Sequence, residues 1–157
     1  MRIAIGSDEA GYSLKEQLKG YLTSKGQEVI DVGCYSTDPV LYPDIAEAAC
    51  EKILSGEADR GVLVCGTGIG MAITANKIPG IRAAVGHDAY SVERGVMSND
   101  CQVITFGARI VSYVYVTRML DEWLGLEFAG GGSTPKVREI AEVESRHAGK
   151  AVRSCNE

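Results

Sequence analysis

The chain has 157 residues, 45% hydrophobic and 24% charged, which is enough for one domain with a substantial core and too few for two. The formal net charge of -5, without any block of Lys or Arg, argues against a general nucleic-acid surface. No run of roughly 20 apolar residues and no signal-peptide profile is present, so we expect a cytoplasmic protein that does not span a membrane.

Short apolar runs alternate with amphipathic segments along most of the chain. The hydrophobic pattern predicts five strands, at residues 2–6, 28–32, 61–64, 82–85 and 103–106. It predicts helices between and after them, at residues 12–25, 42–54, 69–77, 89–97 and 111–124. Strands that are apolar throughout and separated by helices indicate a parallel sheet covered on both faces, hence a three-layer, doubly wound α/β domain. We therefore expect one domain over residues 1–157.

The glycine-rich segment at residues 130–135 interrupts this alternation. It predicts a flexible turn, followed by a last helix that carries Val137, Ile140 and Val143 and runs toward His147. A terminal helix beyond a glycine hinge can pack on a second subunit, so we expect residues 130–157 to reach a partner. We expect residues 148–157 to form a loose tail.

Cys65 ends an apolar strand and opens the glycine-rich turn CGTGIG ahead of a helix. Several backbone N–H groups of such a turn have no helical partner and point toward the thiol. Their positive field favours the thiolate, which could act as a base, a nucleophile or a redox group. A reactive group beside N–H donors for an oxyanion predicts a reaction centre at Cys65.

Two other polar segments follow predicted strands and belong to the same edge of the sheet, where α/β proteins bind ligands. Asp8 follows the first strand, where capping of the next helix by Ser7 or Asp8 and a chemical role are equally plausible. His87 follows the fourth strand and could serve as an acid or base, although a lone histidine at a helix start more often caps or packs. The loop at residues 34–43 is expected to form a pocket wall.

Asn99 and Ser98 precede the fifth strand rather than follow it. They belong to the opposite edge of their own sheet and would reach a site more easily across a dimer interface. The five cysteines are scattered without a C-x-x-C pair, so we expect neither a disulfide framework nor a zinc site.

Several segments together resemble the ribose-5-phosphate isomerase type B family, which includes the galactose-6-phosphate isomerase subunits. The matching segments span roughly residues 2 to 143 and read IAIGSDEAGYSLKEQL, VIDVG, YPDIAEAA, ADRGVLVCGTGIGMAITANKIPGIRAA, HDAYS, SND and VITFGARIV. The resemblance implies a Rossmann-like fold, a homodimer or a dimer of dimers, and metal-independent interconversion of aldose and ketose sugar phosphates through an enediolate. It implies no cofactor.

The resemblance also assigns roles to residues. Cys65 matches the general base that removes a proton from the carbon next to the carbonyl. Thr67 matches a proton shuttle at the substrate oxygens, and Asp8 matches the carboxylate that handles substrate hydroxyls. The remaining matches are the backbone anion hole of Gly66, Gly68, Ile69 and Gly70, the pocket wall Tyr42, the neighbouring subunit's amide at Asn99, and the phosphate-binding Arg109.

The chain departs from the family pattern around the substrate. Glu9 replaces a histidine that contacts the phosphate, and Ser98 replaces the histidine assigned to opening the furanose ring. Gly132 and Lys136 each replace an arginine near the phosphate. The sequence thus retains the enediolate residues but lacks the ring-opening histidine and part of the phosphate clamp.

Three interpretations follow from these departures. The first is ribose 5-phosphate isomerisation, with His87, Asp8 or a water opening the ring and Arg109, Lys136 and Arg138 holding the phosphate. The second is isomerisation of a tetrose 4-phosphate, erythrose or erythrulose 4-phosphate, which cannot form a furanose because its O4 is esterified. The third is a protein that binds a sugar phosphate without turnover, against which the retained Cys65 weighs.

Overall fold

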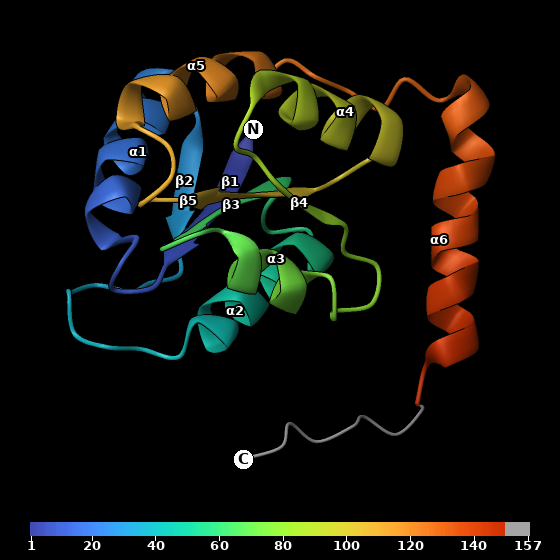
Figure 1. Cartoon of the computed structure of the whole chain (residues 1–157), viewed down its shortest axis with the longest axis horizontal. Coiled ribbons are helices and arrows are strands. Elements are labelled where there is room, and N and C mark those ends of the chain that lie inside the picture. Colours follow the sequence, from blue (N-terminus) through green and yellow to red (C-terminus); the bar gives the residue numbers. More distant parts are fainter. Residues whose placement is uncertain (150–157) are drawn as a thin grey trace.

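The computed structural model describes residues 1–149, and its central feature is one sheet of five parallel strands (Figure 1). The strand order is β2-β1-β3-β5-β4. The strands are β1 (Arg2–Ser7), β2 (Glu28–Asp31), β3 (Arg60–Cys65), β4 (Ala83–Val85) and β5 (Val103–Gly107). The predicted Rossmann-like, doubly wound sheet is confirmed, with the shortest strand, β4, at one edge.

Helices cover both faces of the sheet, as the apolar strands require. One face carries α1 (Tyr12–Ser24), α4 (Ala89–Asn99) and α5 (Tyr113–Trp123), and the other carries α2 (Tyr42–Leu54) and α3 (Ile69–Ala75) (Figure 1). Alternate residues of each central strand enter the two cores. Val62 and Val64 of β3 pack toward α1 and α5, whereas Leu63 and Cys65 pack toward α2 and α3.

Several helix boundaries differ from the sequence-based expectation by one or two residues, and two of these differences have clear local reasons. The predicted helix at 111–124 begins only at Tyr113, because Ser112 caps it and its side chain accepts a hydrogen bond from the Tyr115 N–H. The predicted helix at 69–77 ends at Ala75, because the Asn76 amide bonds to Ala72 and to the backbone of Ala83 instead.

The last helix, α6 (Thr134–His147), follows a short 3-10 turn, η1 (Gly131–Ser133), and stands beside the domain (Figure 1). None of its residues is buried. Ile140 and Val143 are 46% and 44% exposed, and Glu144 accepts a hydrogen bond of 2.9 Å from the Gly80 N–H. The helix exists as predicted, while its role in dimerisation stays a prediction. Residues 150–157 of the expected tail lie outside the described residues.

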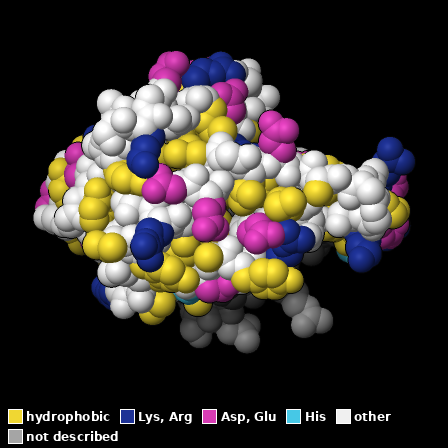
Figure 2. Space-filling model, turned by 90° about the horizontal axis from the view of Figure 1, so that it is seen from above, with side chains coloured by type: hydrophobic (Ala, Val, Ile, Leu, Met, Phe, Trp, Pro, Cys, Tyr) yellow, Lys and Arg dark blue, Asp and Glu magenta, His cyan; other side chains and the backbone are white. Residues whose placement is uncertain are grey.

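Charged side chains of both signs are interspersed with apolar ones on the face seen in Figure 2. Among residues 1–149, no helix is both long enough and apolar enough to cross a membrane.

A buried and an exposed leucine should differ in how much their replacement lowers the free energy of unfolding. Leu18 of α1 is fully buried, whereas Leu54 at the end of α2 is 54% exposed. We expect Leu18→Ala to lower the free energy of unfolding by about 2–5 kcal/mol, because it leaves a cavity in the core. Leu54→Ala should change it by about 0.5 kcal/mol or less. Urea denaturation measures both, and equal losses would contradict the core assignment.

Candidate active site

Cys65 is the last residue of β3, and its side chain is 5% exposed. The Gly68 N–H donates a hydrogen bond of 3.0 Å to Cys65 Sγ. The Ala108 N–H donates to the Cys65 carbonyl at 2.8 Å, which fixes the backbone on the β5 side. A donor aimed at the sulfur stabilises negative charge there, so the geometry favours a reactive thiol over an inert core cysteine.

The loop after Cys65 folds tightly over the end of β5. Gly68 adopts a left-handed conformation, with φ of 78°, that other residues rarely adopt. Its carbonyl accepts a hydrogen bond of 2.8 Å from Thr105 Oγ1, and a Cβ at Gly107 would lie 2.7 Å from the Thr67 carbonyl carbon. The path of the loop therefore depends on the small residues at Gly68 and Gly107.

Thr67 is exposed at the tip of this loop, and its Oγ1 accepts a hydrogen bond of 3.3 Å from the Ile69 N–H. Two N–H groups of the predicted anion hole thus already have partners within the loop. The Gly68 N–H donates to the Cys65 sulfur, and the Ile69 N–H donates to the Thr67 hydroxyl. Ile69 is 54% exposed and borders a cavity of about 470 Å³ between α3 and β4.

Tyr42 and Arg109 lie against two glycines of the loop. A Cβ at Gly70 would lie 2.7 Å from Tyr42 Cζ, so the tyrosine ring packs directly on the backbone of Gly70. The Arg109 guanidinium packs on Gly66, 3.4 Å from where a Cβ would stand, and the Arg109 N–H donates to the Gly66 carbonyl at 3.1 Å. The Tyr42 ring and the exposed Arg109 guanidinium, which come from different elements, therefore flank the loop at residues 65–70. This loop is called the thiol loop below.

Asp8 follows β1 and adjoins the end of β3, where its N–H donates to the Val64 carbonyl at 3.2 Å. Its Oδ1 accepts from the Gly11 N–H at 2.9 Å, so the carboxylate closes the turn ahead of α1. Burial raises the pKa of Asp8 above its ordinary value, Glu9 adds to the shift, and Arg109 opposes it. The Glu9 carboxylate accepts a hydrogen bond of 3.2 Å from the Val40 N–H.

The expectation that Ser7 could cap α1 is wrong. Ser7 is fully buried within β1, and its hydroxyl lies 3.6 Å from Cys34 Sγ. The strand extends one residue further than its apolar run, because Ser7 pairs with β3 and with the backbone of residues 33–34.

His87 does not cap α4, because Asp88 does so by accepting from the Ser91 N–H at 2.7 Å. His87 lies just beyond β4, is partly buried, and its Nε2 is buried without a hydrogen-bond partner among residues 1–149. Buried polar atoms of this kind normally have a hydrogen-bond partner, which the described part of the chain does not supply here.

Three other candidates lie away from Cys65 within one chain. Ser98 and Asn99 end α4 at the amino edge of the sheet, where the Arg94 side chain lies 3.4 Å from Ser98 Oγ and Asn99 Nδ2 donates to the Arg94 carbonyl at 3.0 Å. Lys136 is exposed on α6. A parallel fold forces this separation for Ser98 and Asn99, since a helix that starts at the carboxyl edge ends at the other.

Two buried polar residues near the site were missed from the sequence. Thr105 holds the Gly68 carbonyl, and its polar side chain inside the apolar run 103–106 was the available signal. Lys15 lies on the buried face of α1, next to Leu14 and Leu18. A lysine beside an apolar stripe normally reaches solvent, so its burial gave no sequence signal.

Among residues 1–149, no group of three or more His, Cys, Asp or Glu side chains could hold a metal ion.

Comparison with known proteins identifies close relatives over nearly the whole chain. Ribose-5-P isomerase B of Listeria innocua is 48% identical over 147 residues, which cover 94% of this chain and 99% of the relative. D-erythrulose-4-phosphate isomerase of Pectobacterium atrosepticum is 47% identical over 148 residues, which cover 92% and 95%. The structure of Clostridium thermocellum ribose-5-phosphate isomerase B superposes with a TM-score of 0.92 at 41% identity, covering 94% of this chain and 100% of that one.

The doubly wound sheet, the thiol loop at its edge and these relatives define an aldose–ketose isomerase of sugar phosphates. The Ribose/Galactose Isomerase family model matches residues 3–140, and the chain belongs to that family.

The raised pKa of Asp8 predicts how stability depends on pH. A carboxyl whose pKa is higher in the folded state binds its proton more tightly there, so its ionisation lowers stability as the pH rises through the folded-state pKa. We expect Asp8→Asn, which can still accept from the Gly11 N–H, to be more stable than wild type at pH 7. This difference in stability between the variant and wild type should disappear as the pH falls below 3.8, the ordinary pKa of aspartate.

Urea denaturation between pH 3 and pH 7 measures this difference. Asp38→Asn, in the exposed loop after β2, is the control for replacing an aspartate. An Asp8→Asn variant that is less stable than wild type at pH 7 would contradict the electrostatic account.

Proposed function

We propose that Cys65 is the acid and base that moves the proton between two carbons of the sugar phosphate. The carrying observation is the hydrogen bond of 3.0 Å from the Gly68 N–H to Cys65 Sγ at the carboxyl end of β3. The thiolate removes a proton from the carbon next to the carbonyl, and the C–H electron pair forms the enediolate double bond. The carbonyl oxygen takes up the negative charge. Return of the proton from sulfur to the former carbonyl carbon completes the isomerisation.

The residues around the thiol supply the remaining steps of this proposal. Those backbone N–H groups of Gly66 to Gly70 that have no partner within the loop would stabilise the enediolate oxygen, and one such donor contributes about 10²–10³ in rate. The exposed Thr67 hydroxyl would carry the proton between the two substrate oxygens. Asp8 would bind substrate hydroxyls, and the raised pKa of its carboxyl suits it to share a proton with them.

A second copy of the chain completes the site in this proposal. Ser98 and Asn99 lie at the edge opposite Cys65, and Asn99 is exposed, so a neighbouring subunit can present the Asn99 amide to the enediolate. The apolar side chains of α6, which no element within residues 1–149 buries, fit a role in dimerisation. Lys136 and Arg138 on that helix could then join Arg109 near the phosphate. We propose a homodimer or a dimer of such dimers, and a cytoplasmic location.

Ribose 5-phosphate, interconverted with ribulose 5-phosphate, is the first candidate substrate, since the Listeria relative carries that activity in its name. A tetrose 4-phosphate is the second candidate, and Ser98 specifically favours it. A serine cannot act as the acid and base that opening a furanose requires at neutral pH, and a tetrose 4-phosphate has no furanose to open. The relative from Pectobacterium is named for erythrulose 4-phosphate.

Solvent deuterium exchange tests the role of Cys65 and ranks the substrates. We expect the wild-type protein in D₂O to incorporate deuterium next to the carbonyl of at least one member of a panel of phosphorylated tetroses, pentoses and hexoses. Cys65→Ala should lower this exchange by at least about 10²-fold, because the carbon base is lost. Cys50→Ala, a buried cysteine of α2 to which the proposal gives no role, is the matched control. Full activity of Cys65→Ala would refute the mechanism, and binding without any exchange would indicate a binding protein.

The variant Ser98→His tests whether ring opening limits activity on ribose 5-phosphate. If it does, an imidazole should raise kcat/KM for ribose 5-phosphate by about 10-fold or more and leave erythrose 4-phosphate turnover unchanged. Coupled spectrophotometric assays measure both. No gain on ribose 5-phosphate would count against a missing ring-opening group.

Subunit mixing tests whether Asn99 acts across an interface. Cys65→Ala and Asn99→Ala chains should each be impaired alone. Refolded together, they should regain about one quarter of wild-type activity, because half of randomly paired dimers are mixed and each holds one intact site. Failure of any mixture to exceed the separate variants would contradict a shared site.

A further inference from the structure

Lys15 is completely buried, although lysine is rarely found in the interior of a protein. Its ammonium lies 2.9 Å from both carboxylate oxygens of Asp31 and 2.7 Å from the Cys34 carbonyl. It also lies 2.9 Å from the Glu16 carboxylate. A buried charge is strongly unfavourable unless it is paired and hydrogen-bonded, so these partners are what allow Lys15 to remain inside.

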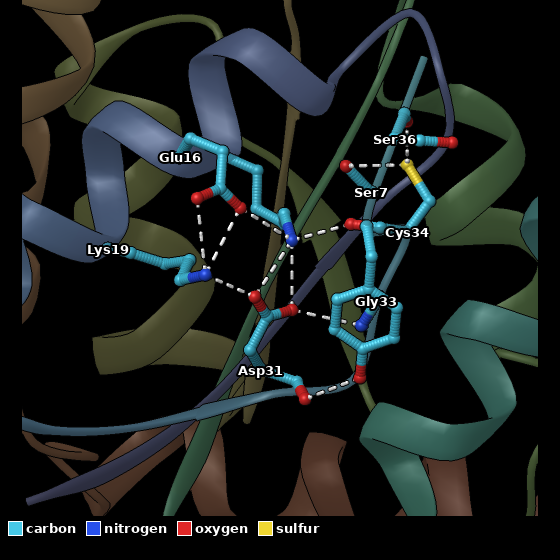
Figure 3. Close-up of polar contacts among 9 residues, drawn as sticks. Ser7, Glu16, Lys19, Asp31, Gly33, Cys34 and Ser36 are labelled. Atoms are coloured by element: carbon cyan, nitrogen blue, oxygen red, sulfur yellow. Dashed lines mark hydrogen bonds and ion pairs between the residues drawn. The ribbon is translucent and has the colours of Figure 1, made fainter. Parts of the chain in front are cut away.

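The partners of Lys15 are tied to the end of β1. Asp31 Oδ1 accepts from the Gly33 N–H at 2.9 Å (Figure 3). The Gly33 carbonyl accepts from the Ser7 N–H at 2.7 Å, and the Cys34 N–H donates to the Ser7 carbonyl at 2.8 Å. Lys15 and Asp31 thus hold residues 33–34 against Ser7, the residue directly before Asp8.

The loop that starts at residues 33–34 forms part of the site. Its far end meets the turn after β1, where the Val40 N–H donates to Glu9. Tyr42 lies two residues after Val40, and its ring packs on Gly70 in the thiol loop. A displacement at the start of this loop would therefore reach Asp8 through Ser7, and Gly70 through Tyr42.

We propose that Lys15 is a positioning residue for the isomerase reaction, acting through Asp31 and the Cys34 carbonyl to hold the Asp8 turn and the Tyr42 wall against the Cys65 loop. This inference rests on the proposed function of Cys65 and Asp8. It assigns Lys15 no contact with substrate. Displacements of about 1 Å at a reacting group can lower a rate by about 10²-fold, so a fixed loop origin matters to the chemistry.

The test separates stability from positioning by removing one charge or both. Lys15→Met leaves Asp31 paired only with the partly exposed Lys19 and the Cys34 carbonyl without its ammonium donor, and should lower stability. Lys15→Met/Asp31→Leu removes both charges and should recover much of that stability, since an apolar pair can replace a buried ion pair. The double variant still cannot hold the Cys34 carbonyl or the Gly33 N–H. We therefore expect it to fold and to show kcat at least about 10-fold below wild type.

The matched control is the surface pair of Lys52 and Glu57, whose side chains are 36% and 56% exposed. Lys52→Met/Glu57→Leu should keep wild-type kcat and KM. A folded Lys15→Met/Asp31→Leu protein with wild-type kcat and KM would overturn the inference. A greater loss of kcat in the Lys15→Met/Asp31→Leu protein than in the surface control, measured at equal folded fraction, would support the inference.

A second readout does not depend on turnover. In ¹⁵N–¹H spectra, the amide signals of Val40 and Gly70 should shift in the Lys15→Met/Asp31→Leu protein and stay in place in the surface control. Unchanged Val40 and Gly70 signals would overturn the positioning role whatever the activity. Absence of deuterium exchange by the wild-type protein would instead refute the proposed function, so the two failures are distinguishable.

Discussion

All five strands run in the same direction, and this constraint arranges every other feature of the molecule. The pairing of Cys65 with Gly107 places the ends of β3 and β5 level with each other, so the thiol loop can fold across onto β5. The turn after β1 meets the same edge, because the Asp8 N–H bonds to the Val64 carbonyl. The same rule sends Ser98 and Asn99 to the far edge, so within one chain these two side chains lie away from the Cys65 loop.

Glycines, which have no side chain, allow the segments of the candidate site to pack closely. Gly107 leaves room for Thr67, Gly70 leaves room for the Tyr42 ring, and Gly11 leaves room for the end of β3, where a Cβ would lie 2.6 Å from the Val64 carbonyl oxygen. Close backbone approach lets the turns after β1, β3 and β5 and the start of α2 lie against one another at this edge. The Arg109 charge partly offsets the rise in the pKa of Asp8 that burial and Glu9 produce.

Sequence patterns predicted the five strands and the helices that follow them because each element has its own apolar periodicity. The edge position of β4 was not predictable in this way, since periodicity does not say which strands are neighbours. Local chemistry explains the smaller errors, such as Ser112 starting α5 and Ser7 extending β1. Cys65 could be singled out because strand end, thiol and glycines are contiguous. Lys15 could not, because its partners Asp31 and Cys34 are distant in sequence and meet it only after folding.

The isolation of α6 has a consequence for how this protein becomes ordered. Most helices owe their stability to packing, and a helix of 14 residues is marginal by itself in water. Apart from the bond between Glu144 and the Gly80 N–H, little in residues 1–149 secures α6 to the sheet domain. A partner that covered the half-exposed Ile140 and Val143 would therefore add free energy toward ordering this segment. If the cover is another copy of the chain, helix content becomes a function of protein concentration, and folding of the last segment is a bimolecular event.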